Sequence, residues 1–263
     1  MEQSTNNPFT EFIPIIDSVK QNDNTVFMTV LNYGYVMYTM NMLKSLAKWG
    51  LDKKILLVCL DNKSYTFFTK KGYVAVYINT DTNLQAFQSY DNAMFRRIMY
   101  YKIMLIGKLL ELHYAVYYTD GDIVYCKDPL RDLETYSASY DMLIQNDRPS
   151  DDIKDLVCAG LFYIRSNTNT RSVFNLENNT AMRIILETEN SDQAYLNNYI
   201  KDKIRYTMFP LNQYPNGQVF YANPGLKDSC ILVHFNWIKG HEKMAKIKEH
   251  GMWFLTEDDE EEI

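Results

Sequence analysis

The sequence predicts an α/β protein built on a doubly wound, mostly parallel sheet. Short apolar runs rich in β-branched and aromatic residues alternate with longer segments in which apolar residues recur every three or four positions. Strand, helix and strand repeated in this order indicate parallel βαβ units. With 46% hydrophobic residues in 263, the chain has enough apolar material for a packed core.

Taken from the N-terminus, each element follows from its local sequence. The expected strands are at 26–31 (VFMTVL), 54–60 (KILLVCL), 73–78 (YVAVYI), 114–119 (YAVYYT), 140–144 (YDMLI), 158–164 (CAGLFYI), 204–209 and 230–235 (CILVHF). The expected helices fill the intervals, at 35–49, 62–71, 90–111, 168–187, 191–202 and 240–250. Because ligands of such sheets gather beyond the carboxyl ends of the strands, residues that follow a strand are the first candidates for a site.

One domain is expected between two less ordered ends. Residues 1–24 are polar, with two prolines and no clear period, and residues 253–263 form an acidic tail. Both ends are therefore expected to be loosely attached. Residues 25–252 contain no repeat and no linker, and are expected to form a single domain.

Charge and hydropathy exclude several classes of function. A net charge of -6 argues against a nucleic-acid-binding protein, which would present a basic face. No segment approaches the roughly 20 uninterrupted apolar residues of a membrane span, and the N-terminus carries no secretory signal. The four cysteines lie singly along the chain, as expected for reduced thiols in the cytoplasm.

The most informative motif is a pair of aspartates at the end of an apolar strand. Asp120-Gly121-Asp122 follows residues 114–119 and leads into the apolar residues 123–125. Two carboxylates in a buried strand repel each other and lose hydration unless a cation neutralises them. Such oxygen ligands select Mg²⁺ or Mn²⁺, which bridge carboxylates to substrate phosphates. Gly121 leaves room for that ligand to approach.

This motif alone leaves two alternatives open. Asp-Gly is a common turn dipeptide, so the pair could be no more than a turn. A phosphotransferase of the haloacid-dehalogenase type also has aspartates after an apolar strand. However, that motif opens the first strand of its domain, whereas a long stretch of regular α/β sequence precedes Asp120, and no completing acidic pair is evident.

With residues 115–130 (AVYYTDGDIVYCKDPL) in view, the chain resembles the nucleotide-diphospho-sugar transferases and, more distantly, glycosyltransferase family 8 with its glycogenin-like members. In those families an apolar strand ends in Asp-x-Asp, and Asp-Pro-Leu often follows. The resemblance extends over residues 25–250, since further family motifs follow in order. It implies a GT-A fold whose Rossmann-like half binds the nucleotide.

Upstream of the aspartates, the resemblance implies contacts to the donor nucleotide. Thr29, Leu31, Asn32 and Tyr33 match the family's first strand and loop, with a polar residue for the base edge and an aromatic ring to stack on it. Lys102, on the helix before the motif, stands where the family places an Arg or Lys that reaches the donor.

Downstream, two further motifs imply contacts to the donor sugar. Ala159 and Gly160 match the small residues that let the sugar lie against the backbone, and Cys158 replaces the Asn of some relatives. Asp192 and Gln193 match an Asp-Gln pair at a helix start. By resemblance, Asp192 binds sugar hydroxyls and Gln193 lies on the side of the anomeric carbon opposite the leaving group, which makes them the catalytic candidates.

The last motif implies the rest of the metal and phosphate site. His234 matches the third metal ligand, beside Asp120 and Asp122, and its neutral imidazole suits Mn²⁺ better than Mg²⁺. Gly240 and Lys243 match the family's phosphate-binding Gly and Lys at a helix start, where the helix dipole also favours an anion.

Together these resemblances imply a metal-dependent glycosyltransferase. It would move a hexosyl or pentosyl group from a nucleoside diphosphate sugar, with UDP as the expected nucleotide, to a glycan, protein or small-molecule acceptor. Retention of anomeric configuration, by front-side attack, is implied as well. A nucleotide-sugar-binding module that lacks catalysis is the alternative outside the enzymes.

Overall fold

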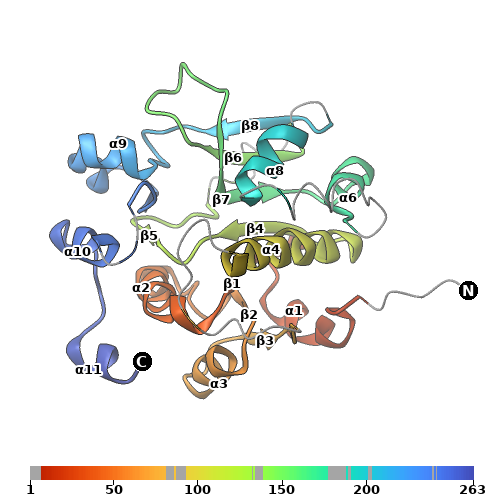
Figure 1. The fold of residues 1–263 in the computed structure, drawn as a ribbon, viewed down its shortest axis with the longest axis horizontal. Helices are drawn as coiled ribbons and strands as arrows, with labels where there is room; N and C mark the ends of the chain where they lie inside the picture. Colours follow the sequence, from red (N-terminus) through yellow and green to blue (C-terminus); the bar gives the residue numbers. More distant parts are fainter. Residues whose placement is uncertain are drawn as a thin grey trace, which may run out of the picture.

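The computed structural model of the chain describes residues 7–80, 86, 93–131, 133, 139–176, 188, 191–200, 203–238, 240 and 242–263. Within them a seven-stranded sheet has the order β3-β2-β1-β4-β7-β6-β8 (Figure 1). Its strands are β1 (Thr25–Leu31), β2 (Leu56–Cys59), β3 (Ala75–Tyr77), β4 (Ala115–Thr119), β6 (Met142–Asn146), β7 (Val157–Ile164) and β8 (Tyr206–Phe209). A two-stranded sheet pairs β5 (Ile123–Tyr125) with β9 (Leu232–His234).

The prediction of a mostly parallel sheet is confirmed. Strands β1 to β4 pair in parallel, as do β6 and β8, while β7 is antiparallel to both β4 and β6. The helices between β1, β2, β3 and β4 provide the crossovers that parallel pairing requires. The Asp120-Gly121-Asp122 turn separates β4 from β5, so these two strands belong to different sheets.

Helices cover both faces of the main sheet. They include α1 (Ile13–Val19), α2 (Val36–Leu46), α3 (Asn62–Lys70), α4 (Ala93–Glu111), α6 (Thr168–Phe174), α8 (Asp192–Tyr199), α9 (Gly217–Ala222), α10 (Glu242–Glu249) and α11 (Glu257–Glu261). Alternating residues of β1 divide between the faces: Val26 and Met28 pack with α1, α4 and α8, whereas Phe27 and Leu31 pack with α2 and α3. None of the described helices is both long and apolar enough to span a bilayer.

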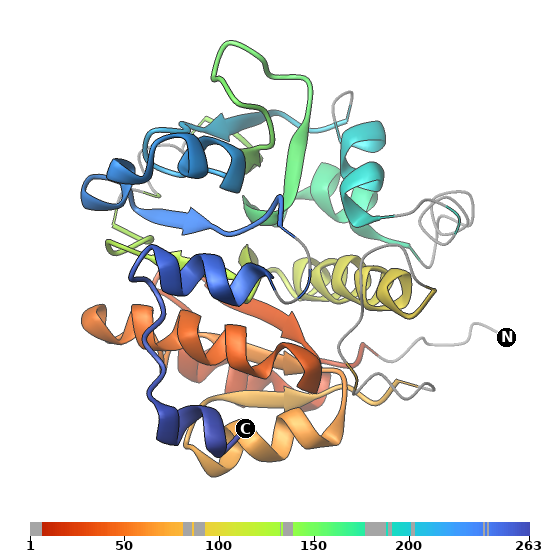
Figure 2. The ribbon, with the colours of Figure 1, turned by 60° about the vertical axis from the view of Figure 1, so that its left-hand side comes forward.

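A third apolar cluster joins the small sheet to the C-terminal helices, and Figure 2 shows β9 lying between α9 and α10. Val124 of β5 and Val233 of β9 pack with Phe220 of α9 and Ile247 of α10. Tyr38 of α2 belongs to the same cluster. The small sheet is therefore held between α2 and the C-terminal helices, which fixes the ends of its strands.

The chain ends hold more structure than the sequence pattern indicates. In the described part of residues 1–24, the side chains of Phe9, Ile16 and Val19 are buried in the main core. The acidic residues 253–263 include α11, which begins with a capping box. Helices of seven and five residues escape a periodicity search, because such a search needs windows of about 11 residues or more.

Candidate active site

The two aspartates lie on either side of the turn that leaves the main sheet. Asp120 directly follows β4, and Asp122 directly precedes β5. The backbone N–H of Asp120 donates to the carbonyl of Gly160 on β7 at 2.7 Å. A Cβ at Gly121 would lie 2.7 Å from Oγ1 of Thr39, so the glycine allows α2 to pack against the turn. The Asp-Gly turn is therefore real, and it presents both carboxylates at the edge of the sheet.

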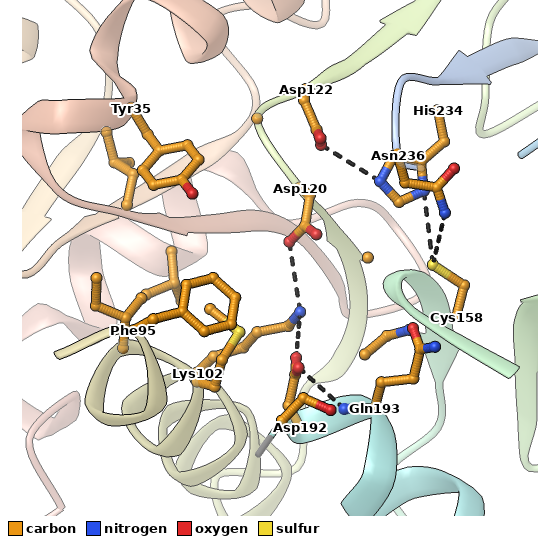
Figure 3. Close-up of a pocket in the computed structure, with 18 of the residues that line it drawn as sticks. Tyr35, Phe95, Lys102, Asp120, Asp122, Cys158, Asp192, Gln193, His234 and Asn236 are labelled. Atoms are coloured by element: carbon orange, nitrogen blue, oxygen red, sulfur yellow. Dashed lines mark hydrogen bonds and ion pairs between the residues drawn. The ribbon is translucent and has the colours of Figure 1, made fainter. Parts of the chain in front are cut away.

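His234 joins the two aspartates from the end of β9. It pairs with Ile123 across the small sheet, which brings it next to Asp122. One ligand atom from each of Asp120, Asp122 and His234 lies within 4.8 Å of the others, and Nε2 of His234 is 3.3 Å from Oδ1 of Asp122. The three side chains face a common space in Figure 3. Two carboxylates and an imidazole at this spacing can hold a divalent ion.

The imidazole of His234 is oriented by Gln145. Nδ1 of His234 lies 2.7 Å from Oε1 of Gln145, whose Nε2 donates to the carbonyl of Tyr214 at 3.0 Å. Nδ1 therefore carries a proton, and Nε2 is the nitrogen that faces the aspartates. Burial lowers the pKa of His234, but Cys158 and Asp122 raise it more, to about 10. Oδ1 of Asp122 is buried and lies 3.3 Å from Nε2 of His234, so both atoms face the space in which a cation would bind.

Two lysines balance the negative charge. Lys243, on α10, forms an ion pair with Oδ2 of Asp122. Burial raises the pKa of Asp122, but Lys243 and the neighbouring imidazole hold it well below its usual range. Lys102, on α4, lies 2.6 Å from Oδ2 of Asp192 and 3.4 Å from Oδ1 of Asp120. Burial lowers the pKa of Lys102, yet these two carboxylates raise it more, so Lys102 stays charged.

Strand β7 passes close to the cluster of Asp120, Asp122 and His234, and no side chain of Gly160 stands between them. A Cβ at Gly160 would lie 2.4 Å from Cε1 of His234 and 2.6 Å from Oδ2 of Asp120. The preceding residue, Ala159, donates its backbone N–H to Oε1 of Gln193 at 3.4 Å. The small residues of β7 thus allow the cluster and the start of α8 to approach the strand.

A buried carboxylate, Asp147, connects α8 to the segment after β9. Its Oδ2 accepts a hydrogen bond from Nε2 of Gln193 at 2.9 Å. Its Oδ1 accepts from Nδ2 of Asn236 and from Nε1 of Trp237, each at 3.0 Å. Burial raises the pKa of Asp147, although these donors favour the ionised form. One side chain therefore fixes three others.

A cavity of about 530 Å³ collects these groups. Most of the predicted site residues line it, namely Leu31, Asn32, Lys102, Asp120, Gly121, Asp122, Ala159, Gly160, Asp192, Gln193, His234, Gly240 and Lys243. Two do not. Thr29 is buried within β1, and the ring of Tyr33 has Nζ of Lys63 3.6 Å from its centre. Tyr35 lines the cavity instead, because successive side chains of the 3₁₀ turn at Tyr33–Tyr35 point in different directions.

The cavity is also lined by residues that the sequence does not predict for the site, among them Tyr35, Tyr118 and Asp147. The hydroxyl of Tyr118 donates to Oδ1 of Asp120 at 2.7 Å. Tyr118 is two residues before Asp120 along the chain, and residues two apart in a strand point to the same face, so this spacing could have placed Tyr118 in the site. Asp147 directly follows β6, and a position just beyond a strand was the signal for it.

Comparisons with known sequences identify related proteins. A family model described as nucleotide-diphospho-sugar transferase matches residues 50–249. The UDP-galactose:fucoside alpha-3-galactosyltransferase of Dictyostelium discoideum is 29% identical, over 93% of this chain and 45% of that protein. The UDP-D-xylose:L-fucose alpha-1,3-D-xylosyltransferase 3 of Arabidopsis thaliana is 21% identical, over 89% of this chain and 68% of that protein. The chain thus spans less than half the length of the Dictyostelium relative.

Solved structures include proteins of the same fold. The galactosyltransferase LgtC, in complex with donor and acceptor sugar analogs, superposes with a TM-score of 0.54 at 16% identity. The superposition covers 90% of this chain and 99% of that one. At this identity the likeness is one of fold.

Proposed function

The chain belongs to the nucleotide-diphospho-sugar transferase family and has the GT-A fold; from this premise we propose that it transfers a sugar from a UDP-sugar to a hydroxyl of a glycan acceptor. The relatives described above are named for UDP-linked donors and fucose-bearing acceptors, which supports both choices. The proposal takes residues 25–252 as the transferase domain, onto whose core Phe9, Ile16 and Val19 also pack. It places the domain in the cytoplasm and includes retention of the anomeric configuration.

The observation that carries the proposal is the cluster of Asp120, Asp122 and His234. Its donor set, two carboxylates and an imidazole with Nε2 facing inward, fits Mn²⁺ better than Mg²⁺. A bound ion would neutralise the diphosphate and the charge that develops on it as the nucleotide leaves. Dependence on Mn²⁺, or on Mg²⁺ in its place, is therefore part of the proposal. The phosphotransferase alternative requires a further acidic pair, whereas the group that joins these aspartates is an imidazole.

The diphosphate has further partners at the start of α10. Lys243 lines the cavity beside Asp122. Gly240, with a φ of 55°, turns the chain just before the helix, and unpaired N–H groups at a helix start favour an anion. Lys102 has a different environment, since it is 1% exposed and paired with Asp120 and Asp192. We assign Lys102 to positioning those carboxylates.

The nucleoside is assigned to the carboxyl end of β1. Leu31 and Asn32 line the cavity there, and Figure 3 shows Tyr35 and Phe95 on one side of it, across from His234. A flat base needs an aromatic face and a polar group for its edge. In this assignment Tyr35 takes the stacking role that the sequence suggested for Tyr33.

The donor sugar is assigned to the start of α8. The carboxylate of Asp192, held by Lys102, would accept hydrogen bonds from sugar hydroxyls. Both ends of the Gln193 amide are engaged, by Asp147 and by the N–H of Ala159. A fixed amide is a poor nucleophile, which favours front-side attack: the acceptor oxygen bonds to the anomeric carbon as the bond to UDP breaks, and the hydroxyl proton passes to the departing diphosphate.

The test is release of UDP from UDP-galactose and UDP-xylose, with and without Mn²⁺. We expect Asp122→Asn and His234→Ala to lower kcat/KM by at least about 100-fold and to weaken Mn²⁺ binding measured by calorimetry. Asp258→Asn, an exposed carboxylate on α11, is the matched control and should leave both unchanged. Wild-type protein that binds UDP and Mn²⁺ but neither hydrolyses nor transfers would instead support the non-catalytic binding module.

A further inference from the structure

Trp237 is an exposed aromatic residue in an unusual backbone conformation beside the cavity. It is 55% exposed and lines the cavity, unlike the exposed Tyr140 and Ile153. Its φ of 63° lies in the left-handed region, which bulky residues rarely adopt. Exposure of an indole and backbone strain both cost free energy, and strain of this kind gathers at functional sites. The surrounding contacts must therefore hold Trp237 in place.

Asp147 provides that restraint. The single donor of the indole, Nε1, is used in the 3.0 Å hydrogen bond to Oδ1 of Asp147, which is 6% exposed. The same carboxyl group accepts from Asn236 and from Gln193. The indole is thus fixed relative to the start of α8. The two faces of its ring carry no hydrogen-bonding group.

A fixed indole in a sugar-transfer cavity suits one face of a pyranose ring. Such a face presents C–H groups to the electron-rich ring, while the hydroxyls at the sugar's edge remain available for hydrogen bonds. In the proposed function the parts of the donor are assigned to other cavity residues: the diphosphate to Lys243, the base to Tyr35 and the donor sugar to Asp192. The acceptor is the substrate that is still without an apolar contact.

We propose that Trp237 forms the platform for the acceptor sugar, and that Asp147 is the positioning residue that holds its indole. The inference rests on the proposed function and deepens it, since it names where the acceptor pyranose packs. The hydroxyl that receives the sugar would lie between Trp237 and the start of α8, within reach of the anomeric carbon.

The first test compares acceptor kinetics with donor hydrolysis, with methyl fucoside as the probe. Trp237→Ala should raise the KM for methyl fucoside about 10- to 100-fold and leave UDP–Mn²⁺ binding and hydrolysis of the donor in water unchanged. Trp237→Phe keeps an aromatic ring but loses the N–H, so its KM for methyl fucoside should lie between those of wild type and Trp237→Ala. Tyr140→Ala, which removes an exposed aromatic outside this cavity, should match wild type.

The outcomes separate the two proposals. If wild type transfers sugar to methyl fucoside and Trp237→Ala does so with the same KM, the platform is refuted while the transferase function stands. If wild type hydrolyses the donor but does not use methyl fucoside, the platform is refuted for a fucoside acceptor. If wild type neither hydrolyses nor transfers, the proposed function fails first.

A second test needs no catalysis. The chain has three tryptophans. Trp237 is exposed, whereas Trp49 and Trp253 are partly buried. In the presence of UDP and Mn²⁺, methyl fucoside should change the intrinsic fluorescence of wild type, and Trp237→Phe should abolish that change. An unchanged response in Trp237→Phe would contradict the platform.

Asp147 is tested by a double-mutant cycle on the acceptor KM. Asp147→Asn should raise KM by itself, because the amide cannot hold all three donors. If Asp147 acts through the indole, Asp147→Asn should raise KM much less in a Trp237→Ala background. Additive effects on KM, with equal losses in kcat, would indicate a merely structural role and overturn the positioning assignment.

Discussion

Gly160 offers the sharpest test of the proposed metal site, because the space beside it is shared by two of the three ligands. In Gly160→Ala, the new Cβ would lie 2.4 Å from Cε1 and 2.9 Å from Nε2 of His234, and 2.6 Å from Oδ2 of Asp120. Carbon atoms in contact prefer roughly 3.5–4.0 Å. Each neighbour must therefore retreat by about 1 Å, or β7 must move.

Neither retreat is easy. His234 is 2% exposed and its Nδ1 is held by Gln145, while Asp120 is held by the hydroxyl of Tyr118. Overpacking of this kind costs about 1–3 kcal/mol of folding free energy. A displacement of about 1 Å in a positioned group lowers activity by about 100-fold. Gly160→Ala should therefore lose Mn²⁺ affinity and transfer activity by a larger factor than its stability loss alone can explain.

The assay is calorimetric titration of Mn²⁺ in the presence of UDP, beside urea unfolding of the same variant. The matched control is Gly225→Ala, where the nearest atom to the new Cβ is 3.6 Å away and no strain arises. The control should change stability by less than about 0.5 kcal/mol and leave Mn²⁺ binding intact. A folded Gly160→Ala protein that binds Mn²⁺ as wild type does would refute the assignment of the ligands.

Further predictions follow from individual contacts. Gln145→Leu removes the acceptor that fixes the tautomer of His234, so Mn²⁺ affinity measured by calorimetry should fall about 10- to 100-fold. Lys102→Met leaves the two carboxylates that contact this buried lysine without their cation, so urea unfolding should report a loss of about 3–5 kcal/mol. The pKa of Asp259 is lowered, chiefly by the backbone N–H of Thr256. Its ionised form stabilises the fold above the unfolded pKa of about 3.9 and the effect is lost as pH falls through the lower folded value. Asp259→Asn should accordingly lower the free energy of unfolding by about 0.5 kcal/mol at pH 6, with a difference that vanishes in acid.

The regular elements could be predicted where their pattern is local. Strand β1 and helix α4 lie within a few residues of the segments predicted for them, because the apolar residues and their spacing that define each element lie within that segment itself. The break between β4 and β5 could not be placed, since residues 123–125 continue the apolar run of 114–119. Which sheet a strand joins depends on β9, more than 100 residues later.

The site could be predicted in part for the same reason. Asp120, Asp122 and His234 stand in recognisable motifs, and the structure brings them together. Asp147 belongs to no motif, and its partners Gln193 and Trp237 are 46 and 90 residues away. Only the pairing of β6 in the sheet brings it into contact with them.

Charge balance in the cavity connects these features. Three of its carboxylates contact three cationic groups, so the charges of these six groups cancel: Asp120, Asp122, Asp192, Lys102, Lys243 and the imidazolium of His234. A fourth carboxylate, Asp147, is held by neutral donors instead. A divalent cation alone would leave excess positive charge in the cavity, and it would also have to displace the proton on Nε2 of His234. A nucleoside diphosphate alone would leave excess negative charge in the cavity. When the two bind together their charges largely cancel, and the carboxylates and lysines can exchange partners within the site without leaving a buried charge unpaired. The arrangement therefore favours the ion and the nucleotide as a pair over either one alone.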